Sequence, residues 1–253
     1  MRDLASVILA AGKGTRMKSS LPKVAFEFCD KPMISHVVET AKRVGCKKIV
    51  VVVGYKAEAV KDILRGQKDV FFAFQSQQNG TGDAVKVAND ALSDFVGDIL
   101  ILYGDVPLIK VGTLKKLIQT HQKCDFACTF ITAKLADPAS YGRVFVDKRG
   151  FVASIIEARD CTTEQLANNE INSGIYCFKS DYLFPHLHKL TNDNDQGEFY
   201  LTDMVKILND MGKRVGRVVV EDVTEISGIN SIEELEVLQK VFSKDLRLDI
   251  KKK

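Results

Sequence analysis

The sequence carries little net charge and has no dominant basic face. Its 36 Lys and Arg residues nearly balance its 33 Asp and Glu residues, so the formal net charge is only +3 over 253 residues. Binding to nucleic acid or to an anionic membrane surface needs a concentrated positive field, whereas the basic residues here are scattered along the chain. The charge balance therefore predicts no nucleic-acid partner and no membrane partner.

Long apolar runs are also missing. None reaches the roughly 18 residues that a membrane-spanning helix requires, and the first four residues lead directly into a strand pattern without a signal peptide. The six cysteines are irregularly spaced, and Cys124 and Cys128 form a pair without the second half of a zinc site. These features predict a cytoplasmic protein with reduced thiols and no bound zinc.

Motifs for nucleophilic catalysis are absent as well. The chain has no Gly-x-Ser-x-Gly elbow, no evident Cys–His pairing and no internal repeat. The four histidines lie outside every candidate loop, at His36, His121, His186 and His188. We therefore expect them to be surface or core residues rather than bases or metal ligands.

What the sequence does contain is an alternation of strand and helix patterns in a chain that is 45% apolar. Alternation in the first half predicts a parallel sheet with helices on both faces. The hairpin pattern around 143–157 predicts antiparallel pairing and a second lobe in the other half. The predicted strands span 4–10, 48–53, 69–74, 98–103, 126–132, 143–146, 151–157, 171–178 and 215–221. The predicted helices span 32–45, a short segment to about 65, 82–92, about 111–123, 180–190, 198–211 and 230–246.

The loop after the first predicted strand is the most informative segment. It reads Leu-Ala-Ala-Gly-Lys-Gly-Thr-Arg-Met over residues 9–17, and Leu-Pro-Lys follows at 21–23. Gly12 and Gly14 let the backbone approach a ligand closely, and their N–H groups can surround an anion. Because three cations follow, at Lys13, Arg16 and Lys23, the segment predicts a phosphate-binding site.

Two common glycine motifs do not fit this loop. A dinucleotide-binding loop needs a third glycine where Met17 stands, and a Walker A loop needs Lys-Ser or Lys-Thr directly after Gly14. A glycine loop without a ligand stays open from the short motif alone. The full string from Leu9 to Met17, together with Leu-Pro-Lys23, resembles sugar-phosphate nucleotidyltransferases. It is most similar to the uridyltransferase domain of the bacterial bifunctional N-acetylglucosamine-1-phosphate uridyltransferases.

This resemblance covers nearly the whole chain but only the first half of the bifunctional enzymes, because the chain lacks hexapeptide repeats. It implies an α/β, Rossmann-like fold with a mixed, mainly parallel sheet flanked by helices and a sugar-binding lobe. Because the repeats are missing, we expect no left-handed β-helix domain. The implied nucleotidyltransferase domain spans 1–228, with a nucleotide-binding half to about 110 and a sugar-binding half from about 111. A C-terminal helix and tail follow at 229–253.

An acid follows the predicted strand 98–103, in the triplet Tyr103, Gly104 and Asp105. Open α/β sheets bind ligands at this end of their strands, and a carboxylate there suits Mg²⁺, which takes few protein oxygens. The alternative for Asp105 is an ordinary turn aspartate. Asn230 could cap the last helix with Glu233, whereas the resemblance implies that it binds the metal with Asp105. Both roles of Asn230 could hold together.

Two further groups of residues are assigned by the resemblance. Gln75, Gly80 and Thr81 form, from the pattern alone, a polar loop with a helix cap, but a glutamine amide can also read the imide edge of uracil. The resemblance implies that they bind the nucleotide, together with Leu9, Ala10, Ala11, Gly12, Lys13, Gly14 and Lys23. It also implies that the sugar is held by Gly142, Glu157 and Asn172, with Tyr103, Gly104, Asp105 and Asn230 completing the substrate site. Asp83 stands where the family often has a histidine, a departure that leaves contacts to the base or the triphosphate open.

The implied reaction joins UTP and N-acetylglucosamine 1-phosphate, and releases pyrophosphate. Mg²⁺ assists an in-line attack on the α-phosphorus, and the sugar phosphate needs no general base because it is already anionic. Arg16, Lys23 and Asp105 are the expected catalytic residues. Lys23 would face the α- and sugar phosphates, with Arg16 and Lys13 facing the β- and γ-phosphates.

Three other functions stay open at this stage. A related enzyme could use glucose 1-phosphate, dTTP or CTP, a non-catalytic protein could bind nucleotide sugars, and a dehydrogenase would bind NADH without needing magnesium. In the resembled enzyme trimerisation comes mostly from the second half, so we expect this chain to be a monomer or a weak homo-oligomer.

Overall fold

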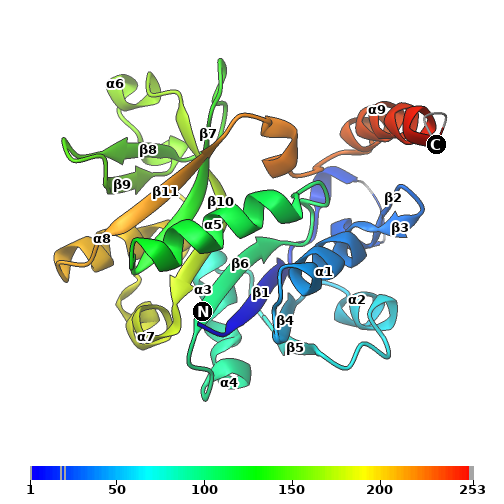
Figure 1. Cartoon of the computed structure of the whole chain (residues 1–253), viewed down its shortest axis with the longest axis horizontal. Helices are drawn as coiled ribbons and strands as arrows, with labels where there is room; N and C mark the ends of the chain where they lie inside the picture. Colours follow the sequence, from blue (N-terminus) through cyan, green and yellow to red (C-terminus); the bar gives the residue numbers. More distant parts are fainter. Residues whose placement is uncertain (1, 18, 20, 251–253) are drawn as a thin grey trace.

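One mixed sheet forms the centre of the molecule (Figure 1). The computed structural model describes residues 2–17, 19 and 21–250, without the side chains of Thr15 and of 243–250. In this part of the chain the order of neighbouring strands is β11-β7-β10-β6-β1-β4-β5, and β8 and β9 extend the sheet beside β10. The strands are β1 (Leu4–Ala10), β4 (Lys48–Val53), β5 (Val70–Phe74), β6 (Asp98–Tyr103), β7 (Cys128–Lys134), β8 (Arg143–Val146), β9 (Val152–Ile156), β10 (Glu170–Lys179) and β11 (Val215–Val220).

Strand direction makes the sheet mixed. The β1, β4, β5 and β6 strands are parallel to one another, as are β7 and β11, whereas β10 runs antiparallel to β6 and β7. A short hairpin of β2 (Glu27–Phe28) and β3 (Lys31–Pro32) lies apart. The predicted α/β fold with a mixed, mainly parallel sheet is confirmed. Because β10 lies between β6 and β7, residues from both halves of the chain share this one sheet.

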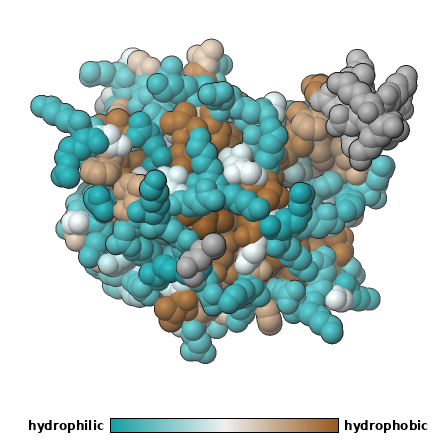
Figure 2. Space-filling model, viewed as in Figure 1, coloured by the Kyte–Doolittle hydropathy of each residue, from teal (hydrophilic) through white to brown (hydrophobic). Residues whose placement is uncertain are grey.

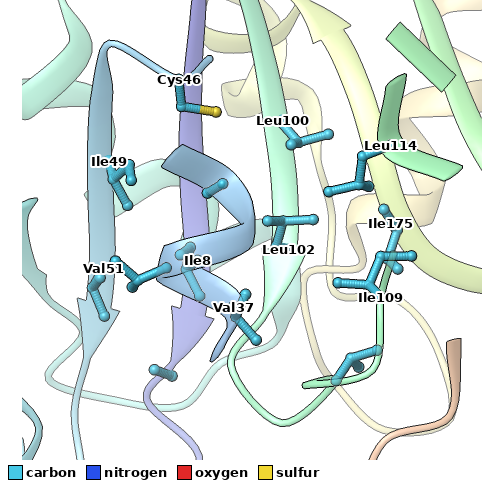
Figure 3. Packing of buried hydrophobic residues seen from close by; sticks show 14 of the residues in the cluster. Ile8, Val37, Cys46, Ile49, Val51, Leu100, Leu102, Ile109, Leu114 and Ile175 are labelled. Atoms are coloured by element: carbon cyan, nitrogen blue, oxygen red, sulfur yellow. The ribbon is translucent and has the colours of Figure 1, made fainter. Parts of the chain in front are cut away.

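Helices cover both faces of the sheet. One face carries α1 (Met33–Arg43), α2 (Ala57–Ile63) and α5 (Val111–Lys123), and its core includes Ile8, Val37, Leu100 and Leu114 (Figure 3). The other face carries α3 (Thr81–Val87), α4 (Asn89–Leu92), α7 (Ser180–Leu183) and α8 (Met204–Asp210). The remaining helices are α6 (Thr163–Leu166) and α9 (Ile232–Ile250). Burial on both faces explains why β1 and β4 read as nearly continuous apolar runs.

Two predicted helices are wrong in extent. The helix expected over 180–190 breaks after α7 into a 3-10 segment at Phe184–Lys189, whose second residue is Pro185, a residue without an N–H group. The helix expected over 198–211 begins only at Met204, after a 3-10 turn at Leu201–Asp203. Phe199 is instead extended against another loop, where its N–H donates to the Asn79 carbonyl at 2.8 Å and its carbonyl accepts from Gly82 N–H at 2.8 Å. These tertiary hydrogen bonds replace those of a helix.

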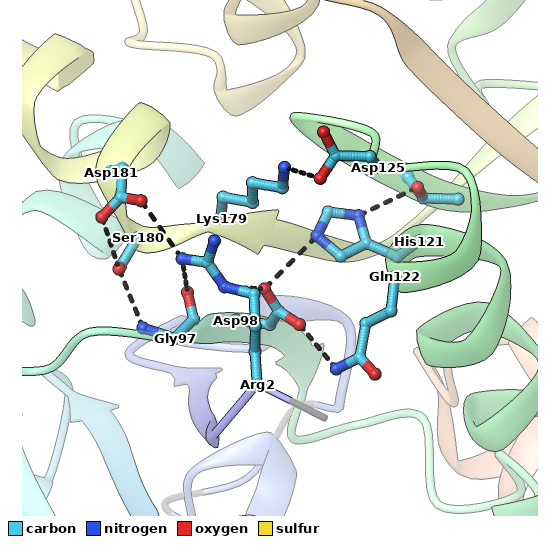
Figure 4. A network of polar contacts seen from close by, with 10 residues as sticks. Arg2, Gly97, Asp98, His121, Gln122, Asp125, Lys179, Ser180 and Asp181 are labelled. Carbon is cyan, nitrogen blue, oxygen red and sulfur yellow. Dashed lines mark hydrogen bonds and ion pairs between the residues drawn. The ribbon is translucent and has the colours of Figure 1, made fainter.

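A buried polar network lies at the amino-terminal end of β6 (Figure 4). Asp98 has no exposed surface, and its carboxylate accepts a hydrogen bond from Gln122 at 2.8 Å and pairs with Arg2 at 3.2 Å. His121 is equally buried, with Nε2 3.6 Å from Asp98 Oδ1 and Nδ1 3.0 Å from the Thr129 hydroxyl. The network ties β6 to α5 and to the segment before β1, and His121 is a core residue, as expected.

The surface is largely hydrophilic on the face drawn in Figure 2, with hydrophobic residues visible between the hydrophilic ones. In the chain as a whole, exposed apolar side chains include Phe71 and Phe74 on β5, and Val237 and Val241 on α9. Within the ranges that the structure describes, no helix combines the length and the apolar character needed to cross a membrane.

Candidate active site

The loop after β1 and the turn after β6 lie side by side at the carboxyl edge of the sheet. Parallel pairing sets Leu9 opposite Tyr103, and Gly104 N–H then donates to the Leu9 carbonyl at 2.9 Å. A Cβ on Gly104 would approach Ile34 Cδ1 to 2.9 Å and Val24 Cγ1 to 3.0 Å, so the turn packs closely on these two side chains. Sheet topology thus delivers Asp105 next to the glycine loop, as expected for an open α/β sheet.

Lys23 joins this turn to a third segment. Its ammonium group forms an ion pair with Asp105 Oδ2 and donates to Asn230 Oδ1 at 2.8 Å. The side chains of Lys23 and Asp105 are only 15% and 17% exposed, so this ion pair is partly shielded from water. Gly14 has a φ of +61°, and a Cβ there would lie 2.5 Å from Lys23 Cβ, so the glycine loop packs directly on the lysine stem.

Asn230 is oriented by its own loop. Its amide nitrogen donates to the Gly228 carbonyl at 2.8 Å, which turns its oxygen toward Lys23, and Ile229 N–H donates to the Asp105 carbonyl at 3.0 Å. The predicted cap by Asn230 and Glu233 is wrong, because the Ser231 hydroxyl accepts from Glu234 N–H at 3.2 Å. The Glu234 carboxylate in turn accepts from the Asn230 backbone N–H at 2.7 Å. The Asn230 side chain is therefore directed at Lys23. Lys23, Asp105 and Asn230 together form a group that we call the lysine cluster.

Gln75 lies at the end of β5 and is 3% exposed. Its backbone N–H donates to the Val53 carbonyl at 2.8 Å, while its side-chain nitrogen donates to Asp83 Oδ2 at 2.8 Å and to the Gly80 carbonyl at 3.3 Å. Gly80 has a φ of +108°, and a Cβ there would lie 2.6 Å from the Phe199 carbonyl oxygen. This loop therefore packs closely on the segment 198–201.

A cavity of about 270 Å³ lies over this part of the sheet edge. It is lined by most of the residues that the sequence analysis assigned to the nucleotide, namely Leu9, Ala10, Ala11, Gly12, Gly14, Lys23, Gln75, Gly80 and Thr81. Lys13 is exposed and is not among its lining residues. The structure thus brings together segments from β1, β5 and α3 around one cavity.

A larger cavity of about 890 Å³ adjoins the first. Its walls include Tyr103, Asp105, Gly142, Glu157, Asn172, Asn230 and Arg16. Thr81, Tyr103, Asp105 and Glu198 line both cavities, so the two form a continuous site with Asp105 where they meet. Gly104 lies in the turn beneath and lines neither.

Glu157 is half-buried in the wall of the larger cavity and accepts a hydrogen bond from the Thr202 hydroxyl at 3.1 Å. Burial raises the pKa of this carboxyl above its usual value, and the nearby acids Asp160 and Asp203 add to the rise. Gly142 leaves room for it, since a Cβ there would lie 3.2 Å from Glu157 Oε2. Asn172 N–H donates to the Gly142 carbonyl at 2.9 Å, and this hydrogen bond ties β10 to the segment before β8 in the same wall.

Two contributors were missed by sequence reasoning. The segment 196–202 had no assigned role, yet Gln196, Glu198, Tyr200, Leu201 and Thr202 all line the larger cavity. Leu201 N–H also donates to the Thr81 hydroxyl at 3.0 Å, so the segment links the two cavities. Tyr176 also lines the larger cavity, and its buried hydroxyl has no hydrogen-bond partner in the described part of the chain. No signal in the sequence separates it from an ordinary core residue of β10.

The geometry described above agrees with the family comparison. Residues 5–229 match the model of the nucleotidyl transferase family. The chain belongs to this family. The predicted family resemblance is confirmed, and many curated relatives of this nucleotidyl transferase support it.

Three relatives illustrate the similarity, each named bifunctional protein GlmU. The protein from Lactobacillus johnsonii is 48% identical over 88% of this chain and 48% of its own length. That from Pelobacter propionicus is 42% identical over 98% of this chain and 55% of its own length. That from Clostridioides difficile is 42% identical over 94% of this chain and 51% of its own length. The chain therefore spans about half the length of the curated relatives it matches.

Solved structures support the fold. One titled as a putative glucose-1-phosphate thymidylyltransferase from Bacillus anthracis has a TM-score of 0.76 at 17% identity and covers 94% of both chains. A UDP-glucose pyrophosphorylase complexed with UDP-glucose has a TM-score of 0.73 at 20% identity, covering 97% of this chain and 100% of its own. At these identities the likeness shows a shared nucleotidyl transferase fold.

The lysine cluster also has the donor set of a divalent cation site. Asp105 Oδ2 and Asn230 Oδ1 both contact the ammonium group of Lys23, so two oxygens converge on one cationic position. No group of three or more His, Cys, Asp or Glu side chains that could hold a metal occurs among the described residues. Two hard oxygens at the edge of the smaller cavity fit a hard divalent cation that takes its remaining ligands from water and substrate.

Proposed function

We propose that this nucleotidyl transferase makes UDP-N-acetylglucosamine and pyrophosphate from UTP and N-acetylglucosamine 1-phosphate. The proposal depends on one observation: the lysine cluster lies where the two cavities meet. The smaller cavity is lined by residues that we expect to bind the nucleotide, and the larger one by residues that we expect to bind the sugar. The identity of 42–48% to proteins named bifunctional GlmU supports the choice of substrates. A site of this shape holds two polyanions with their reacting groups together.

The nucleotide occupies the smaller cavity in this proposal. Gln75 reads the uracil, and the backbone of the glycine loop binds the β- and γ-phosphates together with Arg16, from the wall of the larger cavity, and the exposed Lys13. The sugar occupies the larger cavity, where Gly142, Glu157 and Asn172 hold its hydroxyl and N-acetyl groups. Tyr103 and Gly104 support the turn that places Asp105 between the two cavities.

In the reaction, an oxygen of the sugar phosphate forms a bond to the α-phosphorus of UTP. The bond from that phosphorus to the oxygen bridging the β-phosphate breaks, and pyrophosphate leaves. No proton has to move, because the attacking phosphate is already anionic. Lys23 places a positive charge between the two phosphates and so stabilises the charge that develops at the α-phosphorus.

We also propose Mg²⁺ as the divalent cation, held by Asp105 and Asn230. When bound it supplies charge neutralisation and a template for the phosphate oxygens. With the cation bound, Asp105 and Asn230 would hold it, and the Lys23 ammonium group would face the phosphates. We keep the division of the chain into a nucleotide-binding half to about 110, a sugar-binding half to 228 and a C-terminal helix as part of this proposal.

A pyrophosphate-release assay tests the function. We expect release from UTP with N-acetylglucosamine 1-phosphate, loss of release with a chelator, and recovery with added Mg²⁺. A panel with dTTP, CTP and glucose 1-phosphate measures the selectivity for base and sugar. Absence of pyrophosphate with every pair would contradict the proposal and favour a non-catalytic nucleotide-sugar-binding protein.

A further inference from the structure

The Gln75 side chain is held by a neighbour that the proposed reaction does not use. Its nitrogen donates to Asp83 Oδ2 at 2.8 Å and to the Gly80 carbonyl at 3.3 Å. A glutamine amide has two N–H groups, so these two acceptors engage both of them. The Gln75 oxygen is then the atom left for a ligand in the smaller cavity, which Gln75 lines.

The carboxylate of Asp83 favours only this orientation of the Gln75 amide. An ionised carboxylate can only accept hydrogen bonds. Rotating the Gln75 amide by half a turn would place its oxygen against Asp83 Oδ2 and the Gly80 carbonyl, so three acceptors would face one another. Because Gln75 is 3% exposed, water cannot relieve that arrangement. A neutral neighbour such as asparagine can donate or accept, so only the more distant Gly80 carbonyl, at 3.3 Å, would still oppose the rotated amide.

We propose that Asp83 is a positioning residue for base selection: it fixes the Gln75 amide with the oxygen facing the nucleobase. A fixed acceptor pairs with the N3–H of an imide, as in uracil or thymine. Cytosine carries an unprotonated N3 at the same place, so two acceptors would meet. The inference rests on the proposed function for the assignment of Gln75 to the base, and it adds the residue that makes this reading selective.

The experiment compares Asp83→Asn and Asp83→Ala with the wild-type protein in two readouts. Titration calorimetry with UTP and with CTP gives the binding preference without requiring turnover, and pyrophosphate release gives KM and kcat for both. We expect the preference for UTP over CTP to fall by about tenfold or more in both variants. The KM for UTP should rise more than kcat falls, and the KM for the sugar phosphate should stay unchanged.

Two controls separate positioning from a general effect. Asp90→Asn removes the same charge from an aspartate outside both cavities, in α4, and should leave the preference unchanged. In a Gln75→Ala background, Asp83→Asn should have no further effect on the preference, since no amide remains to be oriented. Thermal melting of each variant checks that it folds, and Asp83→Ala carries the test if Asp83→Asn does not.

Several outcomes would overturn the inference. One is an unchanged UTP preference in folded Asp83 variants, and another is an equal loss of UTP and CTP binding. A third is the same shift in Asp90→Asn, and a fourth is a wild-type protein with no preference for UTP in binding. If wild type binds UTP selectively but releases no pyrophosphate, the proposed function fails while the role of Asp83 is still measured.

Discussion

At the scale of single residues, a few close contacts fix the position of the Lys23 side chain. Its ammonium group is shared by Asp105 and Asn230, and its stem packs against Gly14. In the proposed reaction, Lys23 is already in the site when the substrates arrive and stabilises the charge that develops at the α-phosphorus. We therefore expect the lysine cluster to contribute more to the rate of the proposed reaction than to stability.

We expect Lys23→Ala and Asp105→Ala each to lower kcat by about 10²–10³, because each removes a preorganised charge from the reacting phosphates. Pyrophosphate release under saturating UTP and sugar phosphate measures the loss. Lys31→Ala serves as the matched control, since Lys31 forms an exposed pair with Glu39 away from the site. Turnover at the wild-type rate in either folded variant would refute the assignment.

Glu157 carries a testable dependence on pH. Its folded-state pKa is raised, so the folded protein holds this proton more tightly than the unfolded chain does. Stability should therefore fall as pH rises from the ordinary value of 4.5 through the raised folded-state pKa. Glu157→Gln removes this titration, so the melting temperature of the variant should rise relative to that of the wild type as pH rises through this window.

The same variant separates binding from folding. Because the substituted glutamine would keep the size but not the charge of the native side chain, the KM for the sugar phosphate should rise while the KM for UTP stays constant. Melting curves that run parallel for the two proteins across this pH range would argue against a buried, titrating Glu157.

At the scale of elements, the segment 198–202 connects two parts of the site. It packs on Gly80 through Phe199, accepts and donates backbone hydrogen bonds with the 79–82 loop, and reaches Glu157 through Thr202. The nucleotide-side loop and the sugar-side wall are thus held by one stretch of chain. Displacement of this segment should disturb both cavities.

Gly80→Ala tests that connection. At a φ of +108° with the Phe199 carbonyl 2.6 Å from the added Cβ, we expect a loss of about 1–3 kcal/mol of stability and weaker binding of both substrates. Gly112→Ala is the matched control, because its Cβ meets nothing within 4 Å in the first turn of α5. The control should be stabilised by up to about 1 kcal/mol. Equal melting temperatures for wild type and Gly80→Ala would contradict the packing argument.

At the scale of the whole molecule, the two edges of the sheet have different roles. The carboxyl ends of β1, β5 and β6 hold the two cavities, whereas the opposite edge holds the network around Asp98 (Figure 4). Burial alone would raise the pKa of Asp98, but the neighbouring His121 ring, the hydrogen bond from Gln122 and the charge of Arg2 hold it below its usual range. The ionised carboxylate therefore stabilises the fold.

Asp98→Ala should lower the free energy of unfolding by about 1–3 kcal/mol, because it removes the partner of Gln122 and of the half-exposed Arg2 and leaves a cavity beside the buried His121. The contribution of Asp98 is present above its unfolded pKa near 3.8 and is lost as pH falls through the lowered folded-state value. Denaturant unfolding of wild type and variant at neutral pH and at a pH below 3.8 should show a larger difference at neutral pH. Below its melting temperature the variant should keep wild-type kcat, and a large loss of kcat would contradict the separation of the two edges.

Much of this molecule is set by short-range patterns in the sequence. The apolar runs of β1, β4 and β6 predict buried strands, and the glycine loop with Lys23 predicts an anion site, because strand burial and loop conformation depend on near neighbours. The place of Asp105 follows from its position after a buried strand. These features, with the family resemblance, determined the fold class and most residues that line the smaller cavity.

Only the tertiary structure decided which distant residues meet. Lys23 and Asn230 are 207 positions apart, and their hydrogen bond requires the loop before α9 to return to the turn after β6. The extended course of 198–200 and the pairing of Asp83 with Gln75 likewise depend on contacts between segments. Local propensity favours a helix over 198–211 and a cap at Asn230, but hydrogen bonds formed across the fold outweigh it. Periodicity in a sequence describes an element, whereas the partners of its polar groups depend on the packing of the whole chain.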